Sequence, residues 1–93
     1  MWKLFIIFWL TPIASAPLDF VPEKTAIEFE VDYTFTAEAG CILSAQAAYK
    51  REGAAWAIAN MPDYMGLKRV SRDCRFTPKW AGRQHRNVGP VDR

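Results

Sequence analysis

Apolar and polar residues alternate most regularly between residues 27 and 35. One face of an extended chain would carry Ile27, Phe29, Val31, Tyr33 and Phe35, and the other Glu28, Glu30, Asp32 and Thr34. Alternation with period two, with β-branched and aromatic residues on the apolar side, predicts a half-buried β-strand. We interpret the acidic face as a solvated sheet surface. Its alternative is a partner-binding surface made by Glu28, Glu30 and Asp32.

An alanine-rich stretch over residues 37–52 follows and predicts a helix with neighbouring apolar rows. Thr36 is the expected N-cap and Glu38 suits the positive first turn. Gly53 is the expected end of the helix. Residues 54–59 (AAWAIA) either continue the helix or begin a new segment, and Trp56 is expected to fill the core rather than hold a ligand.

Turn-forming residues mark a loop at 60–66, after which residues 67–76 predict a second, less regular strand. Val70, Cys74 and Phe76 share one side of that strand. Lys68 and Arg72 share the same parity, so either they reach solvent at the sheet edge or a bulge shifts the register. Residues 77–93 are rich in charge, Pro and Gly and predict a basic flexible tail.

This order of strand, helix and strand predicts an α+β fold built on a small βαβ-like unit. The sheet has two or three short strands with one helix packed on it. The crossover is long enough to make the two strands parallel neighbours. Two strands and a helix make a poor sheet alone, so a third strand is expected from residues 17–22, residues 54–59 or a second copy of the chain. A strand left at the edge is a docking site for an extended segment of another protein.

The first sixteen residues have the anatomy of a secretory signal peptide. Lys3 precedes an apolar run from Leu4 to Leu10, and Ala14-Ser15-Ala16 resembles a cleavage site. The alternative is a buried first helix or strand. Pro17 would hinder cleavage and leave some chains tethered by the leader. The predicted organisation is a signal peptide at 1–16, an α/β domain at 17–76 and a tail at 77–93.

The cysteines, Cys41 and Cys74, are expected to form a disulfide in an exported chain. In a parallel arrangement both lie at the same end of the sheet, so the bond ties the start of the helix to the second strand. Two cysteines and the single His85 do not make a four-ligand zinc site. A nucleophilic cysteine would need a base beside it, and His85 lies in the polar tail. We expect no metal and no cofactor.

Charge is divided unevenly along the chain. Residues 17–52 carry seven acidic and three basic side chains, net −4, whereas residues 53–93 carry three acidic and eight basic ones, net +5. We interpret the division as pairing between the halves, with Arg69 and Arg75 meeting the acids of the first strand. Its alternative is an anionic partner held by Lys79, Arg83, Arg86 and Arg93.

No catalytic constellation stands out in the sequence, and we expect a protein that is not an enzyme. The leading hypothesis is a small secreted or periplasmic binding or accessory protein that acts by protein–protein contact, through edge-strand pairing or homodimerisation. Its size would suit an accessory or inhibitor encoded in a bacterial or phage genome. The second is a binder of anionic surfaces (cell-wall polymer, lipid head group or nucleic acid) through the basic tail. Nucleic acid is not an expected partner of the leading hypothesis, and a membrane is one only through an uncleaved leader.

Overall fold

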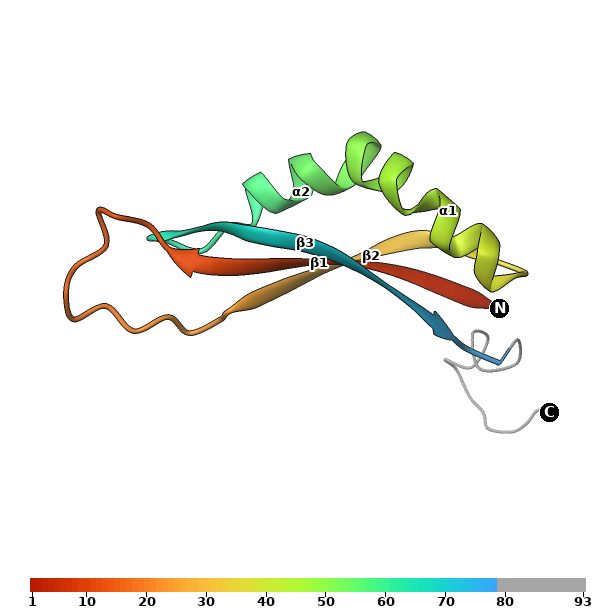
Figure 1. Ribbon diagram of the computed structural model, residues 1–93, viewed down its shortest axis with the longest axis horizontal. Coiled ribbons are helices and arrows are strands. Elements are labelled where there is room, and N and C mark those ends of the chain that lie inside the picture. The colour runs from red at the N-terminus through yellow and green to blue at the C-terminus, as the bar shows by residue number, and fades with distance from the viewer. Residues whose placement is uncertain (79–93) are drawn as a thin grey trace.

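A computed structural model describes residues 1–78 of the chain. Three antiparallel strands form one sheet in the order β2-β1-β3, with β1 (Trp2–Pro12) at the centre, β2 (Ala26–Phe35) at one edge and β3 (Met65–Phe76) at the other. A single helical segment lies along one face of the sheet (Figure 1). The predicted α+β class, with one helix on a short sheet, is therefore confirmed.

Because β2 and β3 are both antiparallel to β1, they run in the same direction, as the sequence predicted. The prediction that they are neighbours is wrong, since β1 lies between them. The third strand comes from the apolar run at the start of the chain, and not from residues 17–22 or 54–59. An unbroken apolar run is typical of a strand that is covered on both faces. Residues 13–25 form the loop from β1 to β2, where Ala16 N–H bonds Ile13 O and Phe20 N–H bonds Pro17 O.

Residues 2–12 thus form a buried strand in the folded chain, the alternative to a signal peptide weighed above. Cleavage after Ala16 remains a prediction, because a signal segment is recognised during export. Such cleavage would remove the central strand of the sheet. It would take with it four of the ten core side chains, Leu4, Ile6, Phe8 and Leu10.

The helical segment has three parts: α1 (Glu38–Ala48), a π-helical turn η1 (Tyr49–Gly53) and α2 (Ala54–Ala59). Ala37 occupies the N-cap position and no side chain caps it, so the predicted Thr36 cap is wrong, whereas Glu38 does lie in the first turn. Gly53 does not end the helix. It is buried where the helix crosses the sheet, and a Cβ there would lie 3.3 Å from Ile6 Cδ1 and 3.6 Å from Phe8 Cζ. Gly53 therefore permits a close approach of helix and sheet.

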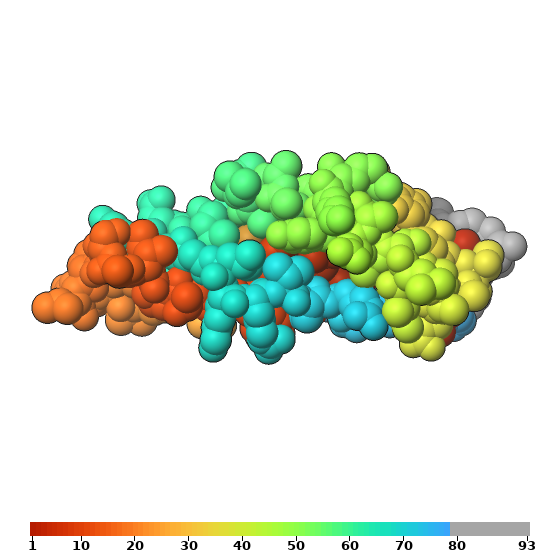
Figure 2. All heavy atoms as spheres, turned by 45° about the horizontal axis from the view of Figure 1, so that its top comes forward, coloured from red at the N-terminus to blue at the C-terminus, as the bar shows by residue number. Residues whose placement is uncertain are grey.

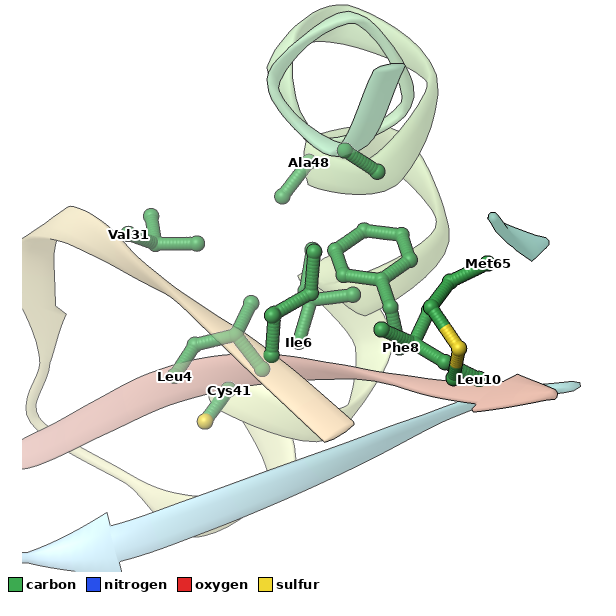
Figure 3. Packing of buried hydrophobic residues seen from close by; sticks show 10 residues of the cluster. Leu4, Ile6, Phe8, Leu10, Val31, Cys41, Ala48 and Met65 are labelled. Carbon is green, nitrogen blue, oxygen red and sulfur yellow. The ribbon is translucent and has the colours of Figure 1, made fainter. Parts of the chain in front are cut away.

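The core lies between this helix and the inner face of the sheet (Figure 3). Ten of the described residues are buried in it: Leu4, Ile6, Phe8, Leu10, Ile27, Val31, Cys41, Ala48, Ala57 and Met65. Small residues of the helix let it lie close to the large side chains of β1. Trp56 is half-buried against this core, with its ring 5.9 Å from that of Phe8 and 5.4 Å from that of Phe29, as expected of a core residue.

The disulfide is confirmed. Cys41, in the first turns of α1, is bonded to Cys74 of β3, with the two Cα atoms 6.2 Å apart. That separation is ordinary for a disulfide. The bond ties the start of the helix to β3, at the end of the sheet where Cys74 pairs with Leu4.

Candidate functional site

The edge of β3 is the first feature that could contact another molecule. Within residues 1–78, β3 pairs only with β1, so the backbone groups on its other side have no strand partner. Leu67 and Val70 on this strand are 46 % and 38 % exposed. The register against β1 shifts between Trp9 and Leu10, which leaves Lys68 without an opposite residue. Of the two alternatives predicted above, the bulge therefore applies to Lys68. Arg72 instead stays in register opposite Ile6 and reaches solvent at the sheet edge.

A groove of about 320 Å³ lies between this edge and the helix. Its lining comes from β1, α1, the π-helical turn and β3: Ile6, Ala45, Gln46, Tyr49, Val70, Ser71 and Arg72. Figure 2 looks onto this side, with β3 in cyan and blue below the green helix and red atoms of β1 showing between them. The lining combines apolar side chains (Ile6, Ala45 and Val70) with polar ones (Gln46, Ser71 and Arg72), a mixture that is usual in a binding groove.

The groove exists because the helix crosses the sheet obliquely. Its start is bonded to β3 through Cys41 and Cys74, whereas Trp56 in α2 packs on Phe29 of β2. The helix therefore moves away from β3 as it proceeds. The π-helical turn begins at Tyr49, which lines the groove, and such turns occur often at functional sites. No pattern in the sequence pointed to this groove, because the groove depends on the angle at which the helix crosses the sheet.

Arg72 at the rim of the groove makes no ion pair with any carboxylate of residues 1–78. The neighbouring Arg75 differs, because its guanidinium donates to Glu28 at 2.9 Å and to Asp73 at 2.7 Å. These hydrogen bonds, that to Glu28 first, raise the pKa of Arg75 above its ordinary value. Lys68 and Arg69 also make no ion pair within residues 1–78, but Arg72 is the basic residue of β3 that lines the groove, and it is placed there to receive an external carboxylate.

The outer face of the sheet carries a second set of contacts. Phe5, Ile7 and Trp9 of β1 point away from the helix and are half-buried. The Arg75 guanidinium lies 3.9 Å from the centre of the Phe5 ring, and that of Arg69 lies 4.6 Å from the centre of the Trp9 ring. Trp9 Nε1–H also donates to Ser71 Oγ at 2.9 Å. These long side chains cover the aromatic rings with their apolar stems and cation–π contacts.

The candidate partner-binding acids of β2 lie beside this outer face. Glu28 is paired with Arg75 and Glu30 with Lys3, both across the sheet, and Asp32 makes no ion pair with the described residues. Pairing of Arg75 with the first predicted strand is therefore confirmed. The predicted pairing of Arg69 with the acids of this strand is wrong, because its guanidinium lies over the Trp9 ring instead. The contact of Lys3 with Glu30 was missed because Lys3 was assigned to the leader.

The four candidate anion-binding residues, Lys79, Arg83, Arg86 and Arg93, lie outside the described residues. In the part of the chain that is described, no group of three His, Cys, Asp or Glu side chains could hold a metal ion. Nor does any helix there have the length and apolar character needed to cross a membrane. No protein-family model, curated protein or solved structure matches this chain.

Proposed function

We propose that this is a small exported, non-catalytic binding protein that recognises a partner protein by pairing an extended segment with the edge of β3. The observation that carries the proposal is a twelve-residue edge strand that, within residues 1–78, is paired on one side alone and has a groove beside it. Main-chain hydrogen bonds to such an edge supply affinity, and pockets beside it for alternate side chains supply specificity.

The bulge and the charges of β3 support selective rather than indiscriminate pairing. Natural sheets protect their edges with bulges and charged residues, above all lysine, and β3 has Lys68 at its bulge with Arg69 beside it. Those features discourage aggregation between edges of like charge. They leave the edge open to a segment whose own side chains complement it.

Export is proposed on two features, the leader-like start and the disulfide. A structural disulfide is typical of proteins that leave the reducing cytosol. The test is to locate the protein in its source cells and to measure its intact mass. Cleavage predicts a chain that begins near Ser15 or Pro17 and lacks β1, so the edge-pairing proposal applies to the uncleaved chain, in which β1 pairs with β3 and Ile6 lines the groove. An intact Met1 in every exported molecule would overturn cleavage and leave β1 in the exported form, and a purely cytosolic location would overturn export.

Edge pairing is tested by selecting peptides from a displayed random library against the immobilised 93-residue chain. Each selected peptide is then resynthesised with single N-methyl groups along its backbone. We expect methylation at alternate positions to weaken binding by about tenfold or more, because only alternate amides of an added strand face β3. Hydrogen exchange should slow at β3 on binding. Peptides insensitive to methylation at every position, or protection confined to β2, would overturn the proposal.

The control for the basic tail is a variant in which Lys79, Arg83, Arg86 and Arg93 are all alanine. Edge pairing predicts unchanged peptide affinity, because it depends on the edge of β3 and on a groove lined by described residues between Ile6 and Arg72. A binder of anionic surfaces would instead lose its affinity in this variant, and its binding would weaken steeply with salt.

A further inference from the structure

We infer that the groove beside β3 selects an acidic extended segment of a partner protein, with an apolar side chain and a carboxylate two residues apart on the same face. This inference rests on the proposed function and adds the chemistry of the partner. It is drawn from the spacing of Val70 and Arg72, which line the groove and lie on the same face of β3.

The spacing follows from strand geometry. Residues two apart on a strand are about 6.8 Å apart and point to the same face. A segment added to β3 would run about 4.8 Å from it, with every second side chain on the helix side. One of these would enter the apolar part of the groove, between Val70 and Tyr49. The next on the same face would lie beside Arg72.

Charge then selects the residue beside Arg72. Four basic residues and one acidic residue lie on β3 (Lys68, Arg69, Arg72, Arg75 and Asp73), so this edge is positive. The acidic partners of Arg75 are already engaged, and Arg72 has no carboxylate partner in residues 1–78. A carboxylate across the edge would form a cross-strand ion pair with Arg72, whereas a lysine would be repelled.

A second copy of the chain fits less well as the occupant. Pairing β3 with β3 of another copy would bring two positive edges together. The acids of β2 lie on its outer face, and its inner face carries Ile27, Phe29 and Val31. Paired parallel to β3 of another copy, β2 would therefore place no carboxylate on the groove side beside Arg72. Antiparallel pairing would turn the acids of β2 to that side, but Glu28 and Glu30 are already paired with Arg75 and Lys3 of their own chain.

The probe is a seven-residue peptide of sequence Thr-Val-Thr-Glu-Thr-Val-Thr, acetylated, amidated and fluorescently labelled. A matched peptide carries lysine in place of glutamate, and a third carries N-methyl groups on alternate amides. Binding to the full chain is measured by fluorescence anisotropy. We expect the glutamate peptide to bind about tenfold more tightly than the lysine peptide, and the methylated peptide to bind at least tenfold more weakly than its parent.

Variants of the protein assign the effect to the groove. Arg72→Glu should reverse the preference between the two peptides. Its matched control, Arg69→Glu, changes the same charge on the same strand but on the outer face, and should preserve the preference. Ala45→Leu fills part of the groove and should weaken both peptides by a similar factor. Circular dichroism and thiol labelling establish that each variant is folded with its disulfide intact.

Each outcome bears on a distinct claim. Equal affinity for the glutamate and lysine peptides, with methylation still disruptive, overturns the acidic selection but leaves edge pairing in place. No measurable binding of the glutamate peptide also overturns the inferred selection of an acidic segment. Edge pairing is then tested separately by the peptide-library experiment. Dimers that dissociate as the glutamate peptide is added would identify a second copy as the occupant and overturn the inference.

Discussion

The two faces of β1 carry similar apolar residues and are covered in different ways. On the inner face Leu4, Ile6, Phe8 and Leu10 are at most 5 % exposed beneath the helix. On the outer face Phe5, Ile7 and Trp9 are half-buried, with arginine side chains from β3 over the two aromatic rings. One layer of helix is therefore enough for this sheet, because long basic side chains shield the other face. Stability should therefore be concentrated on the inner face.

The largest effect is expected from the matched pair Phe8→Ala and Phe5→Ala. Phe8 is fully buried, with the rings of Tyr49 and Trp56 about 6 Å away. Its truncation should lower the free energy of unfolding by about 3–5 kcal/mol, because a cavity is left in the core. Phe5 loses only partial burial and its contact with Arg75, so about 1 kcal/mol is expected. Chemical denaturation of both variants measures the difference, and equal losses would contradict the comparison.

Loss of the disulfide should have the next largest effect, because the bond holds the helix start over the inner face. Cys41→Ser opens a loop between residues 33 apart in sequence. The expected loss is about 3–4 kcal/mol in the chain-entropy model. Cys74→Ser and the double variant should lose the same amount, since all three remove one bond. Two reactive thiols in the native, non-reduced protein would refute the disulfide in solution.

Substitution by alanine at the two glycines of the helix should have smaller effects on stability, of opposite sign at the two positions. Gly40→Ala places a Cβ 3.7 Å from Phe35, an ordinary contact, and should raise stability by about 0.5–1 kcal/mol through helix propensity. Gly53→Ala places a Cβ 3.3 Å from Ile6 on the inner face, and should lower stability by about 1 kcal/mol as the core is overpacked. Thermal denaturation gives both signs. A stabilising Gly53→Ala would show that helix and sheet are less closely packed than described.

The smallest effect is expected on the outer face, at the exposed pair of Glu30 and Lys3. Glu30→Gln should change the free energy of unfolding by less than about 0.5 kcal/mol, because exposed ion pairs contribute little. It should also leave peptide binding within a few-fold, since Glu30 lies on β2, away from the groove. A loss of any assayed activity with the fold intact would assign a functional role to this acidic face.

Local patterns were reliable where a residue's neighbours in sequence decide its structure. The alternation from Ile27 to Phe35 predicted β2, and the strand order together with the two cysteines predicted the disulfide and the common direction of β2 and β3. The prediction that Gly53 ends the helix was wrong, because glycine ends helices at exposed positions. Here glycine is buried, and its lack of a side chain lets the helix pack closely on Ile6. The run Leu4 to Leu10 fits both a signal segment and a central strand, since both require continuous apolar residues.

Local patterns in the sequence were enough to predict that residues 27–35 and 67–76 are extended, that residues 37–52 are helical, and that Cys41 can reach Cys74. The position of the first apolar run at the centre of the sheet did not follow from local patterns, because strand order depends on contacts between residues far apart in the chain. The same holds for the groove at Val70 and Arg72, whose walls come from four elements. A groove arises from the angle at which a helix crosses a sheet, and that angle is set by packing across the whole inner face rather than by any local pattern.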